Sequence, residues 1–442
     1  MGENKIIQLA NIMPTATREN PNQGRIYDTK GIAPTITDVS GGGGRQPMIV
    51  TGKRIRKLTP LECWRLMGFS DADFRKAESR SSNTQLYKQA GNSIVKNVLI
   101  AVFGQMIPGA DGVYKLYPKK GNKHMKERKY VKETPVILYD KAGYPSMMLK
   151  LENTAPTKEI ADPVFLVKEV EYDSIYLSRF LNSAVGDHVV SLPFRDPLVM
   201  VSMDEAIRLI RKKGPEWHLL TNCEWQYIKD TTAPNTHGNT SCGKYHGDST
   251  ESGIGGKYGR TAAGSGPASW FHNGSKETGI ADTIGNVWKI ISGIRLKHGR
   301  LEYMADNDAA APDADLSADS KEFLEVLVDG CPVNIGPGEN GMMITTGEVE
   351  GWDCVEREDV CTDLKTVPQI LIDLGIITDD MESSKELFAA DAEFDEAVCF
   401  VGGSYYDTSH AGSSALSVYT PRSLVSAGFG FFSACLGKPV IR

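Results

Sequence analysis

The stretch that decides the fold lies near the carboxyl end of the 442-residue chain and reads VGGSYYDTSHAGSSALSVYTPRSLVSAGFGFFSACL, residues 401–436. Small and apolar residues recur along it, and polar or aromatic side chains stand between them. Among these side chains are Tyr405, Tyr406, Asp407, His410, Ser417, Tyr419, Thr420 and Ser426. Tyrosine gives a binding surface rigid contact area, and serine and aspartate give it adaptable hydrogen bonds. We therefore predict a ligand-binding surface here, with an ordinary polar rim as the alternative.

Upstream of this stretch, the chain has strand-like patterns first and irregular sequence later. Residues 136–152 alternate well enough for a hairpin, and residues 164–180 suggest a second pair of strands. A capped helix is expected after Ser202, and a second one after residues 221–222. These elements predict a mixed α+β architecture.

Long irregular segments follow. A stretch rich in Gly, Ser, Asn and Thr occupies about 233–278, and a strand pair around Gly299 is expected within 280–310. Residues 366–397 read as an acidic, helical insert. Loops of this length need anchors if they belong to a compact domain. The anchors that we expect in the core are the tryptophans at 217, 225, 288 and 352, and Trp270 is left open.

The back piece, residues 136–442, resembles the C-type-lectin-like domains related to the formylglycine-generating enzyme. The resemblance rests on WHLLTNCEWQYI (217–228), GSGPASW (264–270), GIADTIGNVW (279–288), RLKHGRLEYMADNDAA (295–310) and the terminal stretch. It looks most like the phage and prophage variable proteins that diversity-generating retroelements mutate. Adenine-directed mutation of Asn-type codons yields mainly Tyr, Ser, Asp, His, Asn and Thr, the types found in the predicted surface. The implied partner is a protein or glycan on a cell surface.

In that subfamily a frame of unvarying residues surrounds the variable ones. The corresponding pairs here are Gly402-Gly403, Ala411-Gly412, Ala415-Leu416 and Pro421-Arg422. We expect Ala411, Leu416 and Phe429 to be buried and the eight interspersed residues to face solvent. The ending departs from the usual Gly-Phe-Arg, since Gly430 stands where arginine falls in the family.

No catalytic residue is predicted in the back piece. Cys399 and Cys435 flank the predicted surface, but their surroundings do not match the copper-binding cysteine pair of the formylglycine-generating enzymes. The sequence assigns no metal: Asp306 and Asp308 read as a solvated or calcium-type loop. Calcium binding near Asn273 and Asp282 is left open.

Two further segments predict helices near the amino end, and a third predicts a turn. Residues 24–50 read as two β-rich runs around a glycine turn, which by itself favours a plain solvent loop. Residues 56–69 begin a helix at Thr59, where Glu62 completes the spacing of a capping box. In residues 85–106, Gly91-Asn92 breaks the chain before an apolar helical face.

In this order and spacing, the three segments closely resemble the end of bacterial and phage cytosine-5 DNA methyltransferases. The resemblance implies a small α/β fragment over 1–108. It places Asn92 and Ser93 at the site of the cofactor AdoMet, and Arg45, Gly42 and Gly43 near DNA.

The catalytic motifs of that family do not occur in these 442 residues: neither a Phe-x-Gly-x-Gly loop, nor Pro-Cys, nor Glu-Asn-Val. The reaction needs a thiolate that attacks a flipped-out base. We therefore expect no catalysis by the chain alone, and AdoMet binding only if a missing half complements it. A subunit of a split cytosine-5 methyltransferase is the alternative to a pure ligand-binding protein.

The net charge of −7 hides an asymmetry. Residues 1–108 hold 15 Lys and Arg against 8 Asp and Glu, and residues 115–132 hold 8 against 1, so each carries +7, whereas residues 133–442 hold 26 against 46. The predicted linker, 109–135, reads as a solvated connection or as a nucleic-acid-binding arm. Weak DNA binding is expected from the basic front alone.

Other global features are less specific. No apolar run is long enough for a membrane span, and the start lacks the layout of a secretory signal, so the cytoplasm is the default location and a phage particle the alternative. The eight cysteines form no CxxC pair, which favours free thiols.

Overall fold

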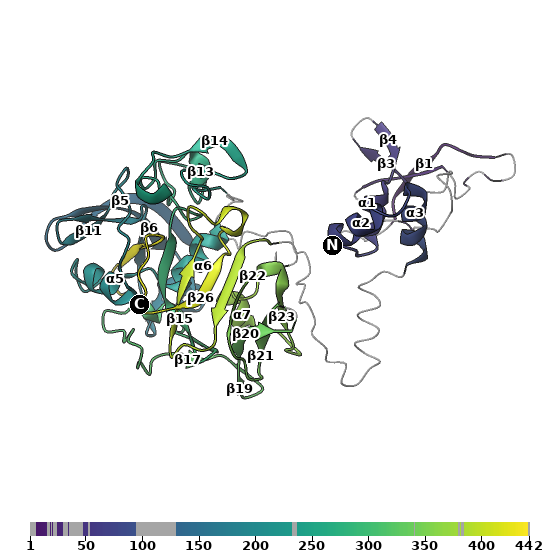
Figure 1. Ribbon diagram of the computed structural model, residues 1–442. Coiled ribbons are helices and arrows are strands. Elements are labelled where there is room, and N and C mark those ends of the chain that lie inside the picture. Colours follow the sequence, from purple (N-terminus) through teal and green to yellow (C-terminus); the bar gives the residue numbers. More distant parts are fainter. Residues whose placement is uncertain are drawn as a thin grey trace. The chain divides into compact units, whose positions relative to one another are not determined.

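The computed structural model describes residues 6–15, 18, 20, 24–29, 34, 47–51, 54–93, 130–231, 237–339, 341–378, 381 and 384–440. The chain divides into two compact units, residues 1–112 and 113–442, which we call the front unit and the back unit (Figure 1). Among the described residues, no helix is long and apolar enough to cross a membrane.

The front unit combines a small sheet with short helices. Its strands, in the sheet order β1-β2-β3-β4, are β1 (Gln8–Asn11), β2 (Arg25–Tyr27), β3 (Met48–Thr51) and β4 (Arg54–Lys57). β2 and β3 run parallel, and the other two pairs are antiparallel. The helices are α1 (Pro60–Leu66), α2 (Asp71–Glu78) and α3 (Asn83–Asn92).

Each of these helices begins at a hydroxyl side chain that caps it. The capping box at α1 is confirmed: Thr59 Oγ1 accepts a hydrogen bond from the Glu62 backbone N–H, and the Glu62 carboxylate accepts one from Thr59 N. Trp64 is buried and donates its indole N–H to the Leu86 carbonyl oxygen at 2.9 Å, which ties α1 to α3. Contrary to the sequence prediction, Gly91 and Asn92 do not break the chain but form the last turn of α3. The apolar face predicted after them lies outside the described residues.

The back unit is built on two sheets (Figure 1). The smaller has the order β12-β28-β9-β6-β5. Its strands are β5 (Val131–Tyr139), β6 (Pro145–Asn153), β9 (Ser174–Ser178), β12 (Trp217–Leu219) and β28 (Ser433–Leu436). Because β28 lies between β9 and β12, the end of the described chain completes a sheet that begins about three hundred residues earlier.

The larger sheet has the order β22-β24-β26-β25-β15-β16-β20-β21-β23, with β17 on β16 and β27 on β15. Its first strands in the chain are β15 (Trp288–Lys297), β16 (Arg300–Tyr303), β17 (Leu324–Glu325), β20 (Asn334–Gly338), β21 (Gly341–Thr345) and β22 (Trp352–Glu356). The remaining ones are β23 (Val360–Thr362), β24 (Leu387–Asp391), β25 (Ala397–Val401), β26 (Leu416–Pro421) and β27 (Phe429–Phe431).

In the described part of this unit, three α-helices and four hairpins of short strands complete the fold. The helices are α5 (Met203–Arg211), α6 (Asn222–Thr231) and α7 (Gln369–Asp373). The hairpins are β7 (Leu166–Val167) with β8 (Val170–Glu171), β10 (Asn182–Val185) with β11 (His188–Ser191), β13 (Lys244–Tyr245) with β14 (Asp248–Ser252), and β18 (Leu327–Val328) with β19 (Cys331–Pro332). The mixture of helices and strands is α+β, as predicted.

Several predicted elements are confirmed and two need correction. The hairpin of β5 and β6 and the strand pair around Gly299 are present, and Ser202 caps α5. However, residues 131–135, predicted as linker, belong to β5. The described part of the insert at 366–397 is mostly not α-helical: α7 covers five residues of it, and β24 is a buried strand in the large sheet. A short apolar run such as LFAA does not distinguish a buried strand from a helix until tertiary pairing is known.

The core of the back unit packs around both sheets, and four tryptophans belong to it. Trp217, Trp225, Trp270 and Trp288 are buried. Trp352 is not: it keeps 57 % of its surface exposed on β22, which corrects the prediction that it packs in the core.

Candidate functional site

The predicted binding surface begins where the chain leaves the fully buried strand β25. Gly402 and Gly403 follow it with φ values of +86° and +72°, a backbone conformation that L side chains rarely adopt. Space also requires glycine, because a Cβ at Gly402 would lie 2.5 Å from the Thr283 carbonyl oxygen and one at Gly403 would lie 2.5 Å from Ala411 Cβ. These two positions set the direction in which the loop departs.

The loop that follows is held by hydrogen bonds at short intervals. The Asp407 carboxylate accepts from the Ser404 backbone N–H at 2.8 Å and from its hydroxyl at 2.9 Å. The Tyr405 N–H donates to the Asn286 carbonyl oxygen at 3.1 Å, and its own carbonyl accepts from Cys242 N at 2.6 Å. The backbone around the two tyrosines is therefore supported from both sides.

A buried lysine lies beneath this loop. Lys289 Nζ donates to the Gly285 carbonyl oxygen at 2.6 Å and to that of Gly403 at 3.4 Å. Burial lowers the pKa of Lys289 to about 7, although the carboxylates of Asp282 and Asp407 act in the opposite direction. Lys289 thus connects the start of the loop to the segment before β15.

The predicted surface residues divide into exposed and buried ones. Tyr406 and Tyr419 keep 55 % and 38 % of their surface exposed. Tyr405, Asp407, His410 and Ser426 are half-buried. Ser417 and Thr420 are buried, at 7 % and 3 % exposure, which corrects the expectation that all eight face solvent.

The position of β26 explains this correction. The strand lies inside the sheet, between β24 and β25, so the side chains of both neighbouring strands flank its short residues on each face, and the longer Tyr419 side chain stays exposed. Ala411 and Leu416 are buried as predicted, whereas Phe429 is half-buried.

Two pairs of aromatic rings mark the exposed part of the surface. Tyr405 and Tyr406 meet edge to face with ring centroids 5.1 Å apart, and Trp352 lies tilted against Tyr419 with centroids 5.4 Å apart. His410 Nε2 lies 3.2 Å from Glu356 Oε1, which connects the loop to β22. We call Tyr405, Tyr406, His410, Tyr419 and Trp352 the aromatic surface. Sequence reasoning missed Trp352 because it lies outside the stretch that carries the other four.

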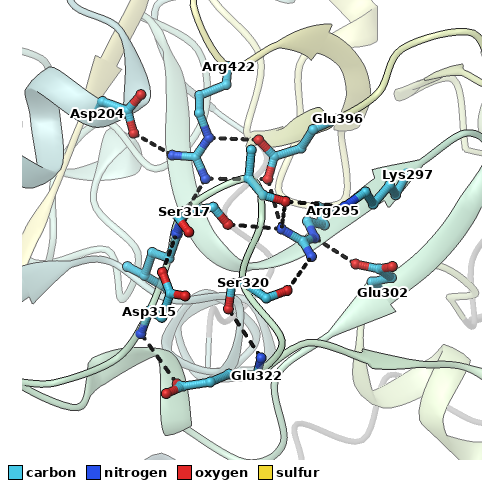
Figure 2. Close-up of polar contacts among 12 residues, drawn as sticks. Asp204, Arg295, Lys297, Glu302, Asp315, Ser317, Ser320, Glu322, Glu396 and Arg422 are labelled. Atoms are coloured by element: carbon cyan, nitrogen blue, oxygen red, sulfur yellow. Dashed lines mark hydrogen bonds and ion pairs between the residues drawn. The ribbon is translucent and has the colours of Figure 1, made fainter.

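A buried charge network holds the far end of β26 (Figure 2). Glu396 accepts from Arg295 Nη1 at 3.1 Å and from Arg422 Nε at 2.6 Å, and Arg422 Nη1 donates to Asp204 Oδ1 at 2.5 Å. Arg295 Nε also donates to Glu302 Oε2 at 2.7 Å.

Backbone carbonyls satisfy the remaining donors of the network. Arg295 donates to the carbonyl oxygens of Ser317, Ala318 and Ser320, and Arg422 donates to that of Leu316. The network therefore joins β15, β16, α5 and the end of β26, so that the surface strand has a rigid attachment at each end.

The two cysteines that flank the predicted surface, and the possible calcium ligands Asn273 and Asp282, lie outside the aromatic surface and are buried or hydrogen-bonded within the fold. Cys399 and Cys435 are free and buried, and burial raises the pKa of both thiols, that of Cys435 to about 12. Burial also raises the pKa of Asp282 to about 6, and its Oδ2 accepts from Gly264 N at 2.8 Å. The Asn273 side-chain oxygen accepts from Ser275 N at 3.0 Å. Among the described residues, no group of three or more His, Cys, Asp or Glu side chains is arranged to hold a metal ion.

In the front unit, the short capped helices carry the predicted cofactor residues. Asn92 is the last residue of α3, and Ser93 caps its end, where the Ser93 hydroxyl donates to the Ala90 carbonyl oxygen at 2.8 Å. Both residues follow the buried helix face formed by Leu86 and Ala90. Arg45, Gly42 and Gly43, predicted near DNA, lie outside the described residues.

Residues 4–108 match the model of the C-5 cytosine-specific DNA methylase family. The orphan methyltransferase M.SPBetaI of Bacillus phage SPbeta is 36 % identical over an alignment of 131 residues, and the match covers 19 % of this chain and 29 % of the relative. The type II methyltransferase M.HhaI of Haemophilus parahaemolyticus is 46 % identical over 80 residues, 17 % of this chain and 22 % of the relative. The chain thus spans less than a third of the length of the curated relatives that it matches.

Among solved structures, the Major Tropism Determinant P3c Variant aligns with 70 % of this chain and 64 % of its own, at 14 % identity and a TM-score of 0.25. That score does not establish a shared fold. The match of residues 4–108, by contrast, confirms the resemblance of the front unit, and methyl transfer in that family uses AdoMet.

Proposed function

We propose that the back unit is a ligand-binding module of the C-type-lectin-like kind, and that the aromatic surface contacts the ligand. The carrying observation is the exposure of Tyr406, Tyr419 and Trp352, at 55 %, 38 % and 57 %, on a backbone held by buried hydrogen bonds. Large aromatic side chains on a rigid support are characteristic of binding hot spots, because little entropy is lost when they are covered.

The ligand in this proposal is a protein or glycan on a cell surface. Support comes from residue types: the surface stretch has Tyr, Ser, Asp and His between small residues, as the variable proteins of diversity-generating retroelements have. The structure adds a physical reason for that alternation, since glycines at 402 and 403 and the buried Leu416 hold the backbone while the tyrosines project.

The test is cell binding by the labelled full-length chain to bacterial hosts. A variant with Tyr406→Ala and Tyr419→Ala should lose most binding, whereas Tyr139→Ala should retain it. Tyr139 is a suitable control because it is an exposed tyrosine of the same unit, on β5, outside the aromatic surface. Equal loss in both variants, or no loss in either, contradicts the proposal.

The second candidate function is that of a split cytosine-5 methyltransferase subunit, and the match of residues 4–108 favours it. The 442 residues contain neither a Pro-Cys nucleophile nor a Phe-x-Gly-x-Gly loop. The purified chain should therefore transfer no methyl group from AdoMet to DNA by itself. Transfer above the buffer background would contradict this reading, and transfer only after a catalytic half is added would support the second candidate.

DNA binding by the basic front is also a proposal. Residues 1–108 hold 15 Lys and Arg against 8 Asp and Glu. Association with DNA should be weak, independent of sequence and steeply reduced by salt, because phosphate contacts release counterions. A fluorescence titration with duplex DNA at several salt concentrations measures the slope, and a version without residues 1–129, which leaves β5 whole, should show no binding.

A further inference from the structure

A cavity of about 420 Å³ lies in the back unit, away from the aromatic surface, between α6, the segment after β16 and α7. Its volume falls within the usual range for small-molecule sites. None of the residues of the aromatic surface lines it. The cavity is therefore a candidate site distinct from the aromatic surface, and ligand binding in it is independent of the function proposed for that surface.

The inner wall of the cavity is apolar and buried. Met304, Ala309, Leu374 and Ile377 line it and have almost no exposed surface. Gly293 on β15 allows the close approach of this wall, since a Cβ there would lie 3.1 Å from Ala309 Cβ and the residue has a φ of +86°. An aliphatic chain would replace water along this wall at a favourable free energy.

Two buried amide side chains, those of Asn222 and Gln226, also line the cavity. Gln226 Nε2 donates to the Leu374 carbonyl oxygen and to Asn222 Oδ1, both at 3.2 Å, and Asn222 Nδ2 donates to Leu374 O at 3.3 Å. Because the Gln226 amide group uses both of its N–H donors, the group it can offer a ligand is its carbonyl oxygen, an acceptor.

The cavity also has an acidic part to its lining, and the aspartates at 306 and 373 are exposed, which places them on its solvent side. Three aspartates, at 230, 306 and 373, line it together with a single basic residue, Lys229, among the described lining residues. Burial and the neighbouring Asp308 charge raise the pKa of Asp306, although the Lys158 charge acts in the opposite direction, so the ionised carboxylate is less stable here than in water. A positive charge placed beside Asp306 would relieve that cost.

We propose that this cavity binds a small aliphatic amine, with its ammonium group at the carboxylates of Asp306 and Asp373 and its chain along Met304 and Ile377. An ammonium group carries three donors and no acceptor, which suits two carboxylates and an amide oxygen. A carboxylate ligand of the same length would meet like charges at these aspartates. A bare metal ion is a poorer fit, because the described acidic residues form no ligating group of three.

The first experiment is calorimetric titration of the full chain with n-hexylamine, and with hexanoate as the anion of the same length. Hexylamine should bind and hexanoate should not. Asp306→Asn should weaken hexylamine binding by up to about fivefold, the effect expected from the loss of one exposed ion pair. Asp319→Asn removes the same charge from an exposed residue outside the cavity and should change nothing.

The second experiment uses Cys223, which lines the cavity, as a reporter of occupancy. Hexylamine should slow alkylation of Cys223, measured by mass spectrometry, several-fold. The exposed cysteines 242, 331 and 354 lie outside the cavity and serve as controls within the same molecule. Equal protection by hexanoate, equal loss in both aspartate variants, or no binding of hexylamine at all would overturn the proposal.

Discussion

The two units of this chain hold their structure together in different ways. In the front unit the decisive contacts are local: the bonds of each cap span three residues, and Trp64 meets Leu86 across 22. In the back unit they are distant: Arg422 reaches Asp204 across 218 residues, and β28 pairs with β9 across more than 250. The front unit therefore depends on signals that a short motif contains, and the back unit depends on pairings that no single segment contains.

The largest loss of stability should follow from a change in the charge network of the back unit, because its contacts join distant parts of the chain. Arg295→Met removes the arginine partner of Glu302, which is largely buried, and leaves the buried Glu396 with Arg422 alone. The free energy of unfolding of the back unit should fall by about 3–5 kcal/mol. Chemical denaturation measures this. Arg300→Met is the matched control, because its pair with Glu325 is exposed and should contribute less than about 1 kcal/mol.

The next largest effect should come from the core beneath the aromatic surface. Leu416 is buried on β26, so Leu416→Ala should destabilise the back unit by about 2–5 kcal/mol through the cavity that it creates. Thermal and denaturant unfolding provide the measurement. If Leu416→Ala lowers the free energy of unfolding no more than an exposed substitution does, Leu416 is not buried and β26 is not an inner strand.

A smaller effect, confined to the front unit, is expected at its first cap. Thr59→Ala removes the hydroxyl that accepts from Glu62 N and should cost about 1 kcal/mol. Hydrogen exchange resolved by peptide should show faster exchange in α1 and unchanged exchange in the strands of the back unit. Faster exchange throughout both units would show that their stabilities are coupled, and would contradict the view that local contacts of its own stabilise the front unit.

The smallest effect on stability should come from the aromatic surface itself. Tyr406→Ala and Tyr419→Ala remove exposed rings, so each should change the free energy of unfolding by no more than about 0.5 kcal/mol. The melting temperatures of Tyr419→Ala and Leu416→Ala compare an exposed and a buried residue of the same strand, β26. Unfolding caused by either tyrosine substitution would place these residues in the core and would end the ligand-binding proposal.

The same division explains what could be predicted from the sequence. The capping box at Thr59 and the hairpin of β5 and β6 were predictable, because both depend on residues close together in the chain. The burial of Ser417 and Thr420 was not, since it follows from the strands on either side of β26. Polar residue type alone predicted exposure for both, and tertiary pairing decided otherwise.

The candidate site shows the same limit. Four members of the aromatic surface were predicted from residue type, but Trp352 joins them only because β22 and β26 both pair with β24. Likewise, the contacts of Lys289 with Gly403 and of Arg295 with Glu396 join residues more than a hundred positions apart in the chain. No spacing rule connects such residues before the sheet order is known.

We propose that exposed side chains of residues 401–436 form a variable binding surface on an unvarying frame, and sequencing can test this. The coding region should be read in many independent isolates of the organism that carries it. Substitutions should gather at Tyr405, Tyr406 and Tyr419, while Gly402, Leu416 and Arg422 should stay unchanged because turn geometry, core packing and the charge network require them. Substitutions spread evenly over both groups, or tyrosines as invariant as the frame, would contradict it.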